Sequence, residues 1–278
     1  MSAFVTPTMR RRLREGVHAA GREVLAIYRR PFAVETKADD SPLTEADLAA
    51  HHALLALLEA VAPGVPVLSE ESEALPFATR RGWRRYWLVD PLDGTKEFIR
   101  KSDEFTLNVA LVEEGVPVFG IVHAPVLGVS WYGQAGQGAR RWEGGQERAI
   151  RVRALPDPER TPWRVVGSRS HGREALAGFC RRLPPHELVT RGSSLKLCLV
   201  AEGTADLYPR FGPTCEWDTA AAQAVVTAAG GEVLDMRTLS PLRCNRQASL
   251  LNPSFIVCGV RDRRWEAALA ACLPSAAD

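Results

Sequence analysis

Acidic side chains follow short apolar runs at several places in this chain, where they could act together on a ligand. Glu70 and Glu71 come after the run 65–68, and Asp90 and Asp93 follow the run 86–89. Asp218 opens an alanine-rich helical segment. Because strand ends and helix starts meet at one rim of an α/β sheet, we expect these carboxylates to lie close together and to repel one another. Hard oxygen ligands without supporting His or Cys favour Mg²⁺ over zinc as the cation that relieves this repulsion.

A second feature beside these carboxylates favours phosphate as the ligand. Gly94 and Thr95 directly follow Asp93 and open a predicted short helix, whose first backbone N–H groups can hold phosphoryl oxygens. A metal site beside such a phosphate cradle is typical of metal-assisted hydrolysis of a phosphate ester. Each element alone has a structural explanation, because Asp-Pro and Asp-Gly are turn dipeptides and Asp47 or Asp218 can cap a helix. Their combination predicts a magnesium-binding phosphate site.

Two helices are predicted ahead of these motifs. The second begins near Thr44 and ends before Pro63, and Thr44-Glu45-Ala46-Asp47 has the form of a capping box. The first covers 8–28, and its first turns are basic, with Arg10, Arg11, Arg12 and Arg14. A basic first turn opposes the helix dipole, so these arginines form either a solvated face or a weak contact with a membrane surface.

Length, composition and charge restrict the class of protein. The chain has 278 residues, of which 46% are hydrophobic and 24% charged, which is typical of a globular protein and excludes extended disorder. A formal net charge of +2 gives no reason to expect nucleic acid as a partner. The six cysteines lack metal-ligand spacing and are expected to be reduced thiols of a cytoplasmic protein. A peripheral position on the cytoplasmic face of the inner membrane and the oligomeric state stay open.

The segment 115–139 contains no Asp, Glu, Lys or Arg and is long enough to be tested as a membrane span. Its prolines, glycines and the alternation of Val116 with Val118 favour two adjacent strands instead. Strands predominate up to the Pro-containing link at 156–162, and helices and strands alternate beyond it. We therefore predict a layered α/β (α+β) fold, in one catalytic domain over 1–278 with sub-parts of about 1–155 and 156–278.

Two motifs resemble the signatures of the inositol monophosphatase superfamily: Asp90-Pro-Leu-Asp-Gly-Thr95, and Glu216-Trp-Asp-Thr-Ala-Ala221 with Ala229-Gly-Gly231. Further segments resemble its 3'(2'),5'-bisphosphate nucleotidase branch, the CysQ type: 39–47, 68–71, 90–99, 168–171, 192–196 and 207–213. The inositol branch more often follows Asp-Gly-Thr with Thr-Asn-Phe, where this chain has Lys96-Glu97-Phe98. The resemblance covers nearly the whole chain. It implies the layered αβαβα fold of the sugar phosphatases, with an antiparallel N-terminal sheet and a mixed α/β C-terminal part.

The resemblance implies that two Mg²⁺ ions bind at these motifs, with a third position left open. One ion is expected to bind Glu70, Asp90 and the carbonyl oxygen of Leu92. The second is expected to bind Asp90, Asp93 and Asp218. A water activated at this site would attack phosphorus in line, so no covalent enzyme intermediate is expected.

The resemblance also implies roles for the residues around the metals. Asp47 is expected to orient Thr95, which together with Glu70 positions the attacking water. The backbone N–H groups of Gly94 and Thr95 would hold the phosphoryl oxygens. The residues implied to bind substrate are Gly94, Thr95, His171, Ser193, Lys196, Arg210 and Asp218. Lys196 and Arg210 have the charge that a second phosphate requires, although His171 and Lys196 could also be solvated surface residues.

The implied reaction is the Mg²⁺-dependent, lithium-sensitive hydrolysis of the 3'-phosphate of adenosine 3',5'-bisphosphate to AMP and phosphate, a reaction of sulfur metabolism. The alternative within the superfamily is an inositol-1-phosphate or fructose-1,6-bisphosphate phosphatase. A different class, a module that binds phosphonucleotides or RNA without hydrolysing them, is disfavoured because a binding module has no reason to keep the acidic set together with Thr95.

Overall fold

The larger of the two main sheets takes its strands from the first half of the chain. The computed structural model describes residues 4–37, 42–168 and 172–272. Within these residues the sheet has seven strands: β3 (Val67–Ser69), β4 (Arg85–Asp93), β5 (Thr106–Glu113), β6 (Val116–Ala124), β7 (Val129–Gln134), β8 (Gly138–Glu143) and β9 (Gln146–Ile150). They lie in chain order, and every neighbouring pair is antiparallel except β3 with β4. The predicted antiparallel N-terminal sheet is therefore confirmed.

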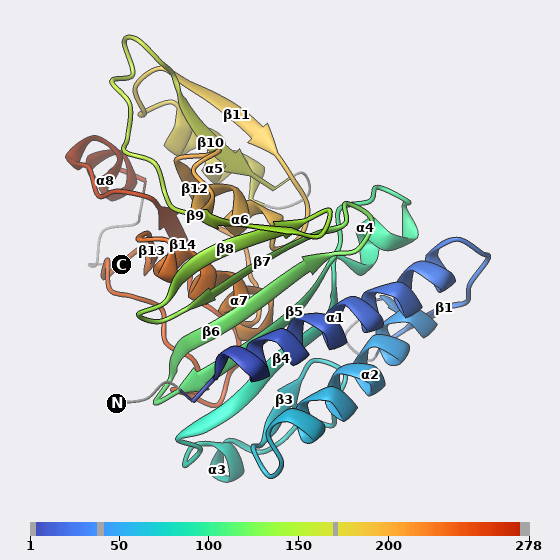
Figure 1. Cartoon of the computed structure of the whole chain (residues 1–278). Coiled ribbons are helices and arrows are strands. Elements are labelled where there is room, and N and C mark those ends of the chain that lie inside the picture. The colour runs from blue at the N-terminus through green and yellow to red at the C-terminus, as the bar shows by residue number, and fades with distance from the viewer. Residues whose placement is uncertain (1–3, 38–41, 169–171, 273–278) are drawn as a thin grey trace.

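Two long helices cover one face of this sheet (Figure 1). α1 (Pro7–Tyr28) and α2 (Glu45–Val61) lie side by side, and the small sheet of β1 (Val34–Thr36) and β2 (Pro42–Thr44) connects them. α1 buries an apolar stripe with helical spacing, which includes Leu13, Val17, Val24 and Ile27. The stripe packs on apolar side chains of the sheet in one continuous core.

The opposite face of the large sheet is covered by α6 (Leu195–Ala201) and α7 (Glu216–Ala228). α7 approaches the backbone of β6 and β7 directly. A Cβ atom on Gly120 would lie 2.0 Å from the carbonyl oxygen of Ala221, and one on Gly133 would lie 2.6 Å from Cα of Val225. The absence of side chains at these two glycines therefore sets how closely α7 lies on the sheet.

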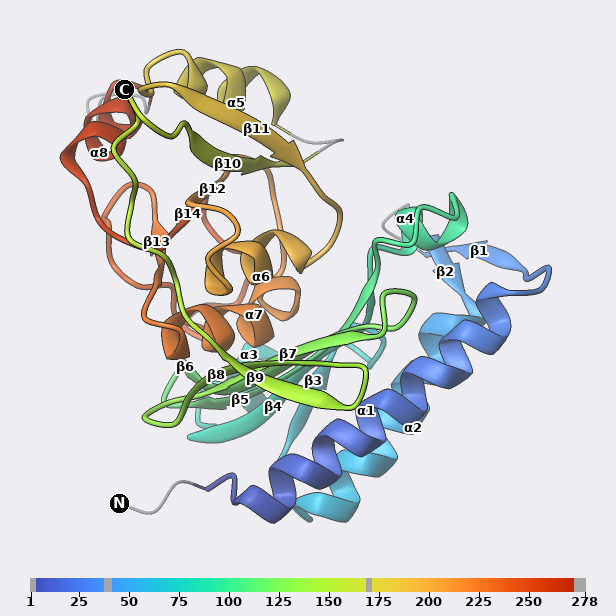
Figure 2. The ribbon, with the colours of Figure 1, turned by 45° about the horizontal axis from the view of Figure 1, so that its top comes forward.

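A second sheet and two outer helices complete the fold (Figure 2). The five-stranded sheet has the order β11-β10-β12-β14-β13, with parallel pairs on one side and antiparallel pairs on the other. Its strands are β10 (Trp163–Gly167), β11 (His186–Thr190), β12 (Leu207–Arg210), β13 (Glu232–Asp235) and β14 (Phe255–Cys258). α5 (Arg173–Cys180) and α8 (Arg263–Ala270) pack on its outer face around the buried Trp163 and Trp265. The layers follow one another as helix, sheet, helix, sheet, helix, so the expected αβαβα architecture is confirmed.

Most elements form where the sequence predicts them, and a few boundaries differ. The apolar segment 115–139 contains the two strands β6 and β7, and the polar segment after it forms the β8–β9 hairpin. The link 156–162 contains neither helix nor strand. α7 begins at Glu216, two residues before the predicted start, because Cys215 has the extended backbone of an N-cap. Among the described residues, no helix combines the length and the apolar character that crossing a membrane requires.

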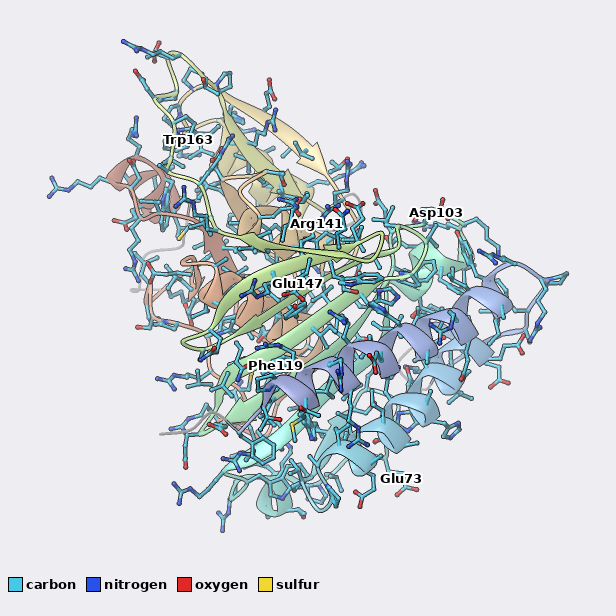
Figure 3. The ribbon with its side chains drawn as sticks, viewed as in Figure 1. Glu73, Asp103, Phe119, Arg141, Glu147 and Trp163 are labelled. Atoms are coloured by element: carbon cyan, nitrogen blue, oxygen red, sulfur yellow. The ribbon has the colours of Figure 1, made fainter. Side chains whose placement is uncertain are left out.

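The basic first turns of α1 contact neighbouring elements. Arg10 donates a hydrogen bond to Gln134 of β7, and Arg12 donates to a carbonyl of α2. Arg14 pairs with Glu147 of β9, which Figure 3 marks above α1. Arg11 is exposed. Arg10 and Arg14 therefore help to hold α1 against the sheet and Arg12 links it to α2, which gives the basic turn a structural role.

Candidate functional site

A β-bulge in β4 brings Asp90 and Asp93 to the same face of the sheet. Asp90 pairs with Asn108 of β5, whereas Asp93 pairs with Thr106, and the register shifts between them. Three steps along β4 therefore match two steps along β5, so β4 contains one extra residue. Side chains alternate between faces in a regular strand, so residues three apart would point to opposite faces without this extra residue.

Three carboxylates from separate elements meet beside the bulge. Oxygen atoms of Glu70, Asp90 and Asp218 all lie within 4.8 Å of one another. Glu70 follows β3, Asp90 lies in β4, and Asp218 lies in the first turn of α7. Burial and the repulsion between neighbouring carboxylates raise the pKa of each of the three above its ordinary value. This all-oxygen set fits a hard divalent cation such as Mg²⁺, because the charge of such an ion would offset the repulsion between the carboxylates.

Asp93 is oriented by the loop that precedes α6. Its Oδ2 atom accepts hydrogen bonds of 2.6 Å from the Ser193 hydroxyl, the Ser194 hydroxyl and the Ser194 backbone N–H. Asn108 adds a longer contact of 3.4 Å to the same oxygen. The Ser194 hydroxyl also lies 2.9 Å from the carbonyl oxygen of Asp218, so one serine contacts two of the expected metal ligands. Within the described parts of the chain, the hydrogen bonds to Asp93 all go to Oδ2, which leaves Oδ1 able to bind a cation.

Asp47 combines a structural contact with a contact to Thr95. Its Oδ2 atom accepts hydrogen bonds from the backbone N–H and the hydroxyl of Thr44, at 2.7 and 2.6 Å, which caps α2 as predicted. Its Oδ1 atom accepts the Thr95 hydroxyl at 3.1 Å. That hydroxyl also lies 3.2 Å from the carbonyl oxygen of Leu92. The two carboxylate oxygens of Asp47 thus have different partners.

Thr95 begins the short helix α4 (Thr95–Ile99), directly after Gly94. Gly94 has a φ of 95°, a left-handed conformation that glycine adopts without strain. A Cβ atom there would also lie 3.2 Å from the carbonyl oxygen of Glu104. The turn from β4 into α4 therefore depends on glycine.

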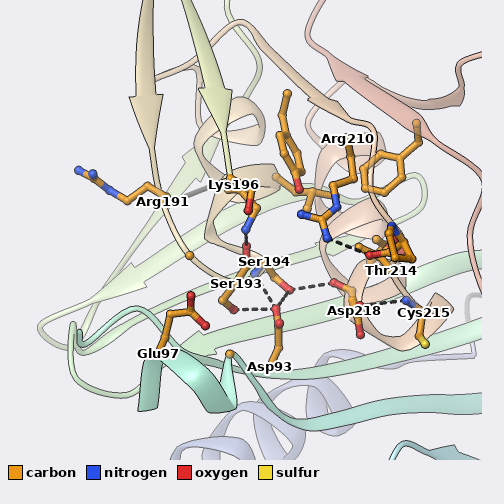
Figure 4. Close-up of a pocket in the computed structure, with 18 of the residues that line it drawn as sticks. Asp93, Glu97, Arg191, Ser193, Ser194, Lys196, Arg210, Thr214, Cys215 and Asp218 are labelled. Carbon is orange, nitrogen blue, oxygen red and sulfur yellow. Dashed lines mark hydrogen bonds between the residues drawn. The ribbon is translucent and has the colours of Figure 1, made fainter. Parts of the chain in front are cut away.

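A pocket of about 450 Å³ opens beside Asp93 and Asp218, and its far wall is cationic (Figure 4). Lys196 is buried there and donates to the carbonyl of Ser193 at 2.6 Å. Burial lowers the pKa of Lys196 to about 8, and Asp93 opposes this effect. Arg210, also buried, donates to the carbonyls of Gly212 and Pro213. The pocket therefore places two cations opposite the carboxylates.

The structure brings together the expected site residues that it describes: Asp47, Glu70, Asp90, Leu92, Asp93, Gly94, Thr95, Ser193, Lys196, Arg210 and Asp218. His171 and residues 39–41 of the resembling segments lie outside the described residues. The hydroxyl of Ser193 contacts Asp93 and Thr106, so it acts on a carboxylate of the site in addition to lining the pocket.

Sequence reasoning missed Lys37 and Ser194. Lys37 forms ion pairs with Glu70 at 3.1 Å and with Glu71 at 2.6 Å. Burial alone would lower the pKa of Lys37, but the bonds to Glu71 and Glu70 outweigh it and raise the pKa. No local pattern marks this lysine, because its partners lie more than thirty residues away in the sequence. Ser194 stands within the resembling segment 192–196, and its contact with Asp93 could have been predicted only from that resemblance.

Comparison with known proteins decides the family. The sequence profile of the Inositol monophosphatase family matches residues 9–275. The chain belongs to this family. The family resemblance inferred from the sequence motifs is therefore confirmed.

Several curated relatives in this family are named 3'(2'),5'-bisphosphate nucleotidase CysQ. That of Salmonella typhimurium is 48% identical over 240 residues, which cover 86% of this chain and 94% of the relative. That of Escherichia coli K12 is 47% identical with the same coverage.

Solved structures of the family have the same fold. CysQ from Bacteroides thetaiotaomicron superposes with a TM-score of 0.79 at 40% identity, covering 90% of this chain and 97% of that one. An inositol monophosphatase from Zymomonas mobilis gives a TM-score of 0.74 at 27% identity, covering 98% and 99%. The identity is thus higher to the CysQ protein than to this inositol monophosphatase.

Proposed function

We propose that the protein hydrolyses the 3'-phosphate of adenosine 3',5'-bisphosphate to give AMP and phosphate. The observation that carries this proposal is a pocket that meets the carboxylate cluster at Asp218 and is also lined by two buried cations, Lys196 and Arg210. Such a pocket suits a substrate with one phosphate at the metals and a second phosphate at the cationic wall. The curated relatives at 47% and 48% identity are named for this class of reaction.

The residues that would hold Mg²⁺ are Glu70, Asp90, the carbonyl of Leu92, Asp93 and Asp218, for two or three ions. When bound, Mg²⁺ supplies charge that lowers the pKa of a water and stabilises the oxygen that leaves phosphorus. The proposal includes inhibition by Li⁺, because this small monovalent cation would compete with Mg²⁺ for the same oxygen ligands.

The protein groups position the reactants. Because the Thr95 hydroxyl donates to Asp47, its lone pairs can accept a hydrogen bond from the attacking water. A carboxylate oxygen of Glu70 can accept a second one, which aims the water at phosphorus. The N–H groups of Gly94 and Thr95 would hold the phosphoryl oxygens. Water adds to phosphorus, the bond to the ribose 3'-oxygen breaks, and that oxygen takes a proton.

Phosphate release from adenosine 3',5'-bisphosphate tests this proposal, with inositol 1-phosphate and fructose 1,6-bisphosphate assayed in parallel. We expect the highest kcat/KM for the nucleotide, no release after chelation of Mg²⁺, and reduced release with Li⁺. A preference for inositol 1-phosphate or the sugar bisphosphate would show that the proposed substrate is wrong, while the proposed metal-dependent hydrolysis would still stand. Binding of the nucleotide without Mg²⁺-dependent release would favour a binding module and contradict the enzyme.

The location proposed for this enzyme is cytoplasmic, and the arginines of α1 are the feature that suggests a contact with a membrane surface. Replacing Arg10, Arg11, Arg12 and Arg14 with Gln tests that connection. Loss of co-sedimentation with vesicles containing anionic lipid would support a peripheral contact. If the wild-type protein does not co-sediment with the vesicles, or if the variant co-sediments equally well, the membrane hypothesis is wrong. The arginines then have only their structural contacts within the fold.

A further inference from the structure

Glu97 is a carboxylate of the pocket that the proposed reaction leaves without a role. Three carboxylates line the pocket, and the other two have hydrogen-bond donors within the protein. Asp93 accepts from Ser193 and Ser194, and Asp218 accepts from the backbone N–H of Cys215. Across the described ranges, no residue donates a hydrogen bond to the side chain of Glu97 or pairs with it. Figure 4 shows this carboxylate rising from α4 beside the loop of Arg191 and Ser193.

Packing holds Glu97 in this position. A Cβ atom on Gly192 would lie 3.0 Å from Cγ of Glu97 and 2.9 Å from the carbonyl oxygen of Glu104. The stem of Glu97 therefore occupies space that a side chain at position 192 would need. Glu104 differs from Glu97, because its carboxylate accepts the backbone N–H of Gly192 at 2.8 Å and thereby holds the loop.

A bound ligand that displaces water from a half-buried carboxylate must supply a hydrogen-bond donor in its place, whereas a phosphate group is repelled. Glu97 lies in the first turn of α4, directly after the Gly94–Thr95 turn that is proposed to hold the phosphate, and it lines the same pocket. Its carboxylate thus reaches a group that neighbours the phosphate held at the start of α4. In a nucleoside phosphate, the nearest donor is the hydroxyl on the adjacent sugar carbon, whereas the base amino group lies much farther from that phosphate.

We propose that Glu97 accepts a hydrogen bond from the sugar hydroxyl adjacent to the scissile phosphate. It is a specificity residue for substrates with a free hydroxyl beside the phosphate, and it disfavours a second phosphate on that carbon. The inference rests on the proposed function and identifies the 2'-hydroxyl as the substrate group that Glu97 recognises.

The test compares adenosine 3',5'-bisphosphate with its 2'-deoxy analogue by kcat/KM. A hydrogen bond to a charged group is worth enough that the wild-type enzyme should prefer the ribose substrate by roughly 10-fold or more. In Glu97→Ala, the preference should fall to about 2-fold or less through slower turnover of the ribose substrate alone. Glu97→Gln should give an intermediate preference, because its amide oxygen still accepts a hydrogen bond. The matched control is Glu59→Ala, which removes an exposed carboxylate of α2 outside the pocket lining and should keep the wild-type preference.

Several outcomes would overturn this inference. An unchanged preference in Glu97→Ala would show that the carboxylate does not contact the hydroxyl. If Glu97→Ala lowers kcat/KM equally for both substrates, Glu97 acts through the charge of Lys196 or through its packing against Gly192, and not through the hydroxyl. If Glu97→Ala instead removes a preference for the adenosine substrate over its inosine analogue, Glu97 contacts the amino group of the base and not the sugar hydroxyl. If the wild-type enzyme releases no phosphate from the bisphosphate, the proposed function fails and this inference fails with it.

Discussion

The pocket has an acidic side and a cationic side, and the buried charges of the two sides are stabilised in different ways. On the acidic side, Asp218 lines the pocket and forms a cluster with Glu70 and Asp90, and burial and mutual repulsion raise the pKa values of all three. On the cationic side, burial lowers the pKa of Lys196 to about 8, while carbonyl oxygens accept the hydrogen bonds of Lys196 and Arg210. Carbonyls stabilise the cations in the free protein, whereas among the described residues Lys37 beside Glu70 is the one cation that forms an ion pair with this cluster.

This difference indicates that the two sides depend on ligands to different degrees. The carboxylate cluster should gain much stability from a divalent cation, because binding removes both the repulsion and the raised pKa values. Lys196 and Arg210 already donate hydrogen bonds to backbone carbonyl oxygens. A bound phosphate would therefore replace these acceptors with its own oxygens. We therefore expect the metals to affect both stability and activity, and the cationic side to affect mainly substrate selection.

Replacing Asp90 with Asn should have the largest effect. The amide cannot supply a charged ligand, so phosphate release should fall by about 10³-fold or more. Without Mg²⁺, the variant should unfold at a higher temperature than the wild type, because a neutral group replaces a buried charge among like charges. Thermal unfolding with and without Mg²⁺, alongside the release assay, checks both parts. A fully active variant would contradict the assignment of Asp90 to the metals.

Replacing Arg210 with Ala should have the next largest effect, and a selective one. Loss of a charged hydrogen bond should lower kcat/KM for the bisphosphate by roughly 10- to 100-fold. Adenosine 3'-monophosphate, which lacks the second phosphate, should change by less than about 3-fold. Equal losses on the two substrates would indicate that the variant has moved the 210–213 turn, and Arg210→Lys, which keeps the charge, separates these explanations.

The titration of Lys196 should give a smaller, pH-dependent effect. Its pKa of about 8 means that the free enzyme loses this charge as the pH rises through 8, so an anionic group binds less tightly above that pH. The KM for the bisphosphate should rise there by at most about tenfold per pH unit. The KM for adenosine 3'-monophosphate should stay flat. Lys196→Arg, which stays charged, should flatten the bisphosphate profile, and a profile that does not change would remove Lys196 from phosphate binding.

A third buried polar cluster serves as a comparison, because it is neutral and needs no ligand. His18 and His123 both contact the Ser130 hydroxyl, at 2.7 and 2.9 Å, between α1 and the large sheet. Burial, with Arg14 and Arg22 nearby, lowers the pKa of His18 to about 4, and burial with His18 lowers that of His123 to about 3.

The two histidines should make the fold sensitive to acid. As the pH falls below the ordinary histidine pKa of about 6.5, the unfolded chain binds protons that the folded protein does not. The free energy of unfolding should therefore fall by up to about 1.4 kcal/mol per pH unit for each histidine. Urea unfolding at several pH values between 7 and 4 measures this slope. In His123→Gln the slope should be smaller, and an identical slope would place the acid sensitivity elsewhere.

Local sequence patterns predicted the elements of the site well and its internal contacts poorly. Asp90, Asp93 and Asp218 could be identified because each stands at the end of an apolar run or the start of a helix, where a sheet rim gathers side chains. The contact of Ser194 with Asp93 joins residues 101 positions apart, and that of Lys37 with Glu70 joins residues 33 apart. Neither pair has a periodicity or a turn signal, so only the folded structure brings them together.

The bulge in β4 makes the site sensitive to the number of residues as well as to their identity. Asp90 and Asp93 share a face because the strand carries one residue more than its partner, and Leu92 between them packs in the core. Many substitutions at Pro91 would keep this count, whereas deleting that one residue would restore regular pairing and shift the frame of everything after it. A length change of a single residue would thus separate the turn into α4 from the carboxylates, even with every chemical group still present.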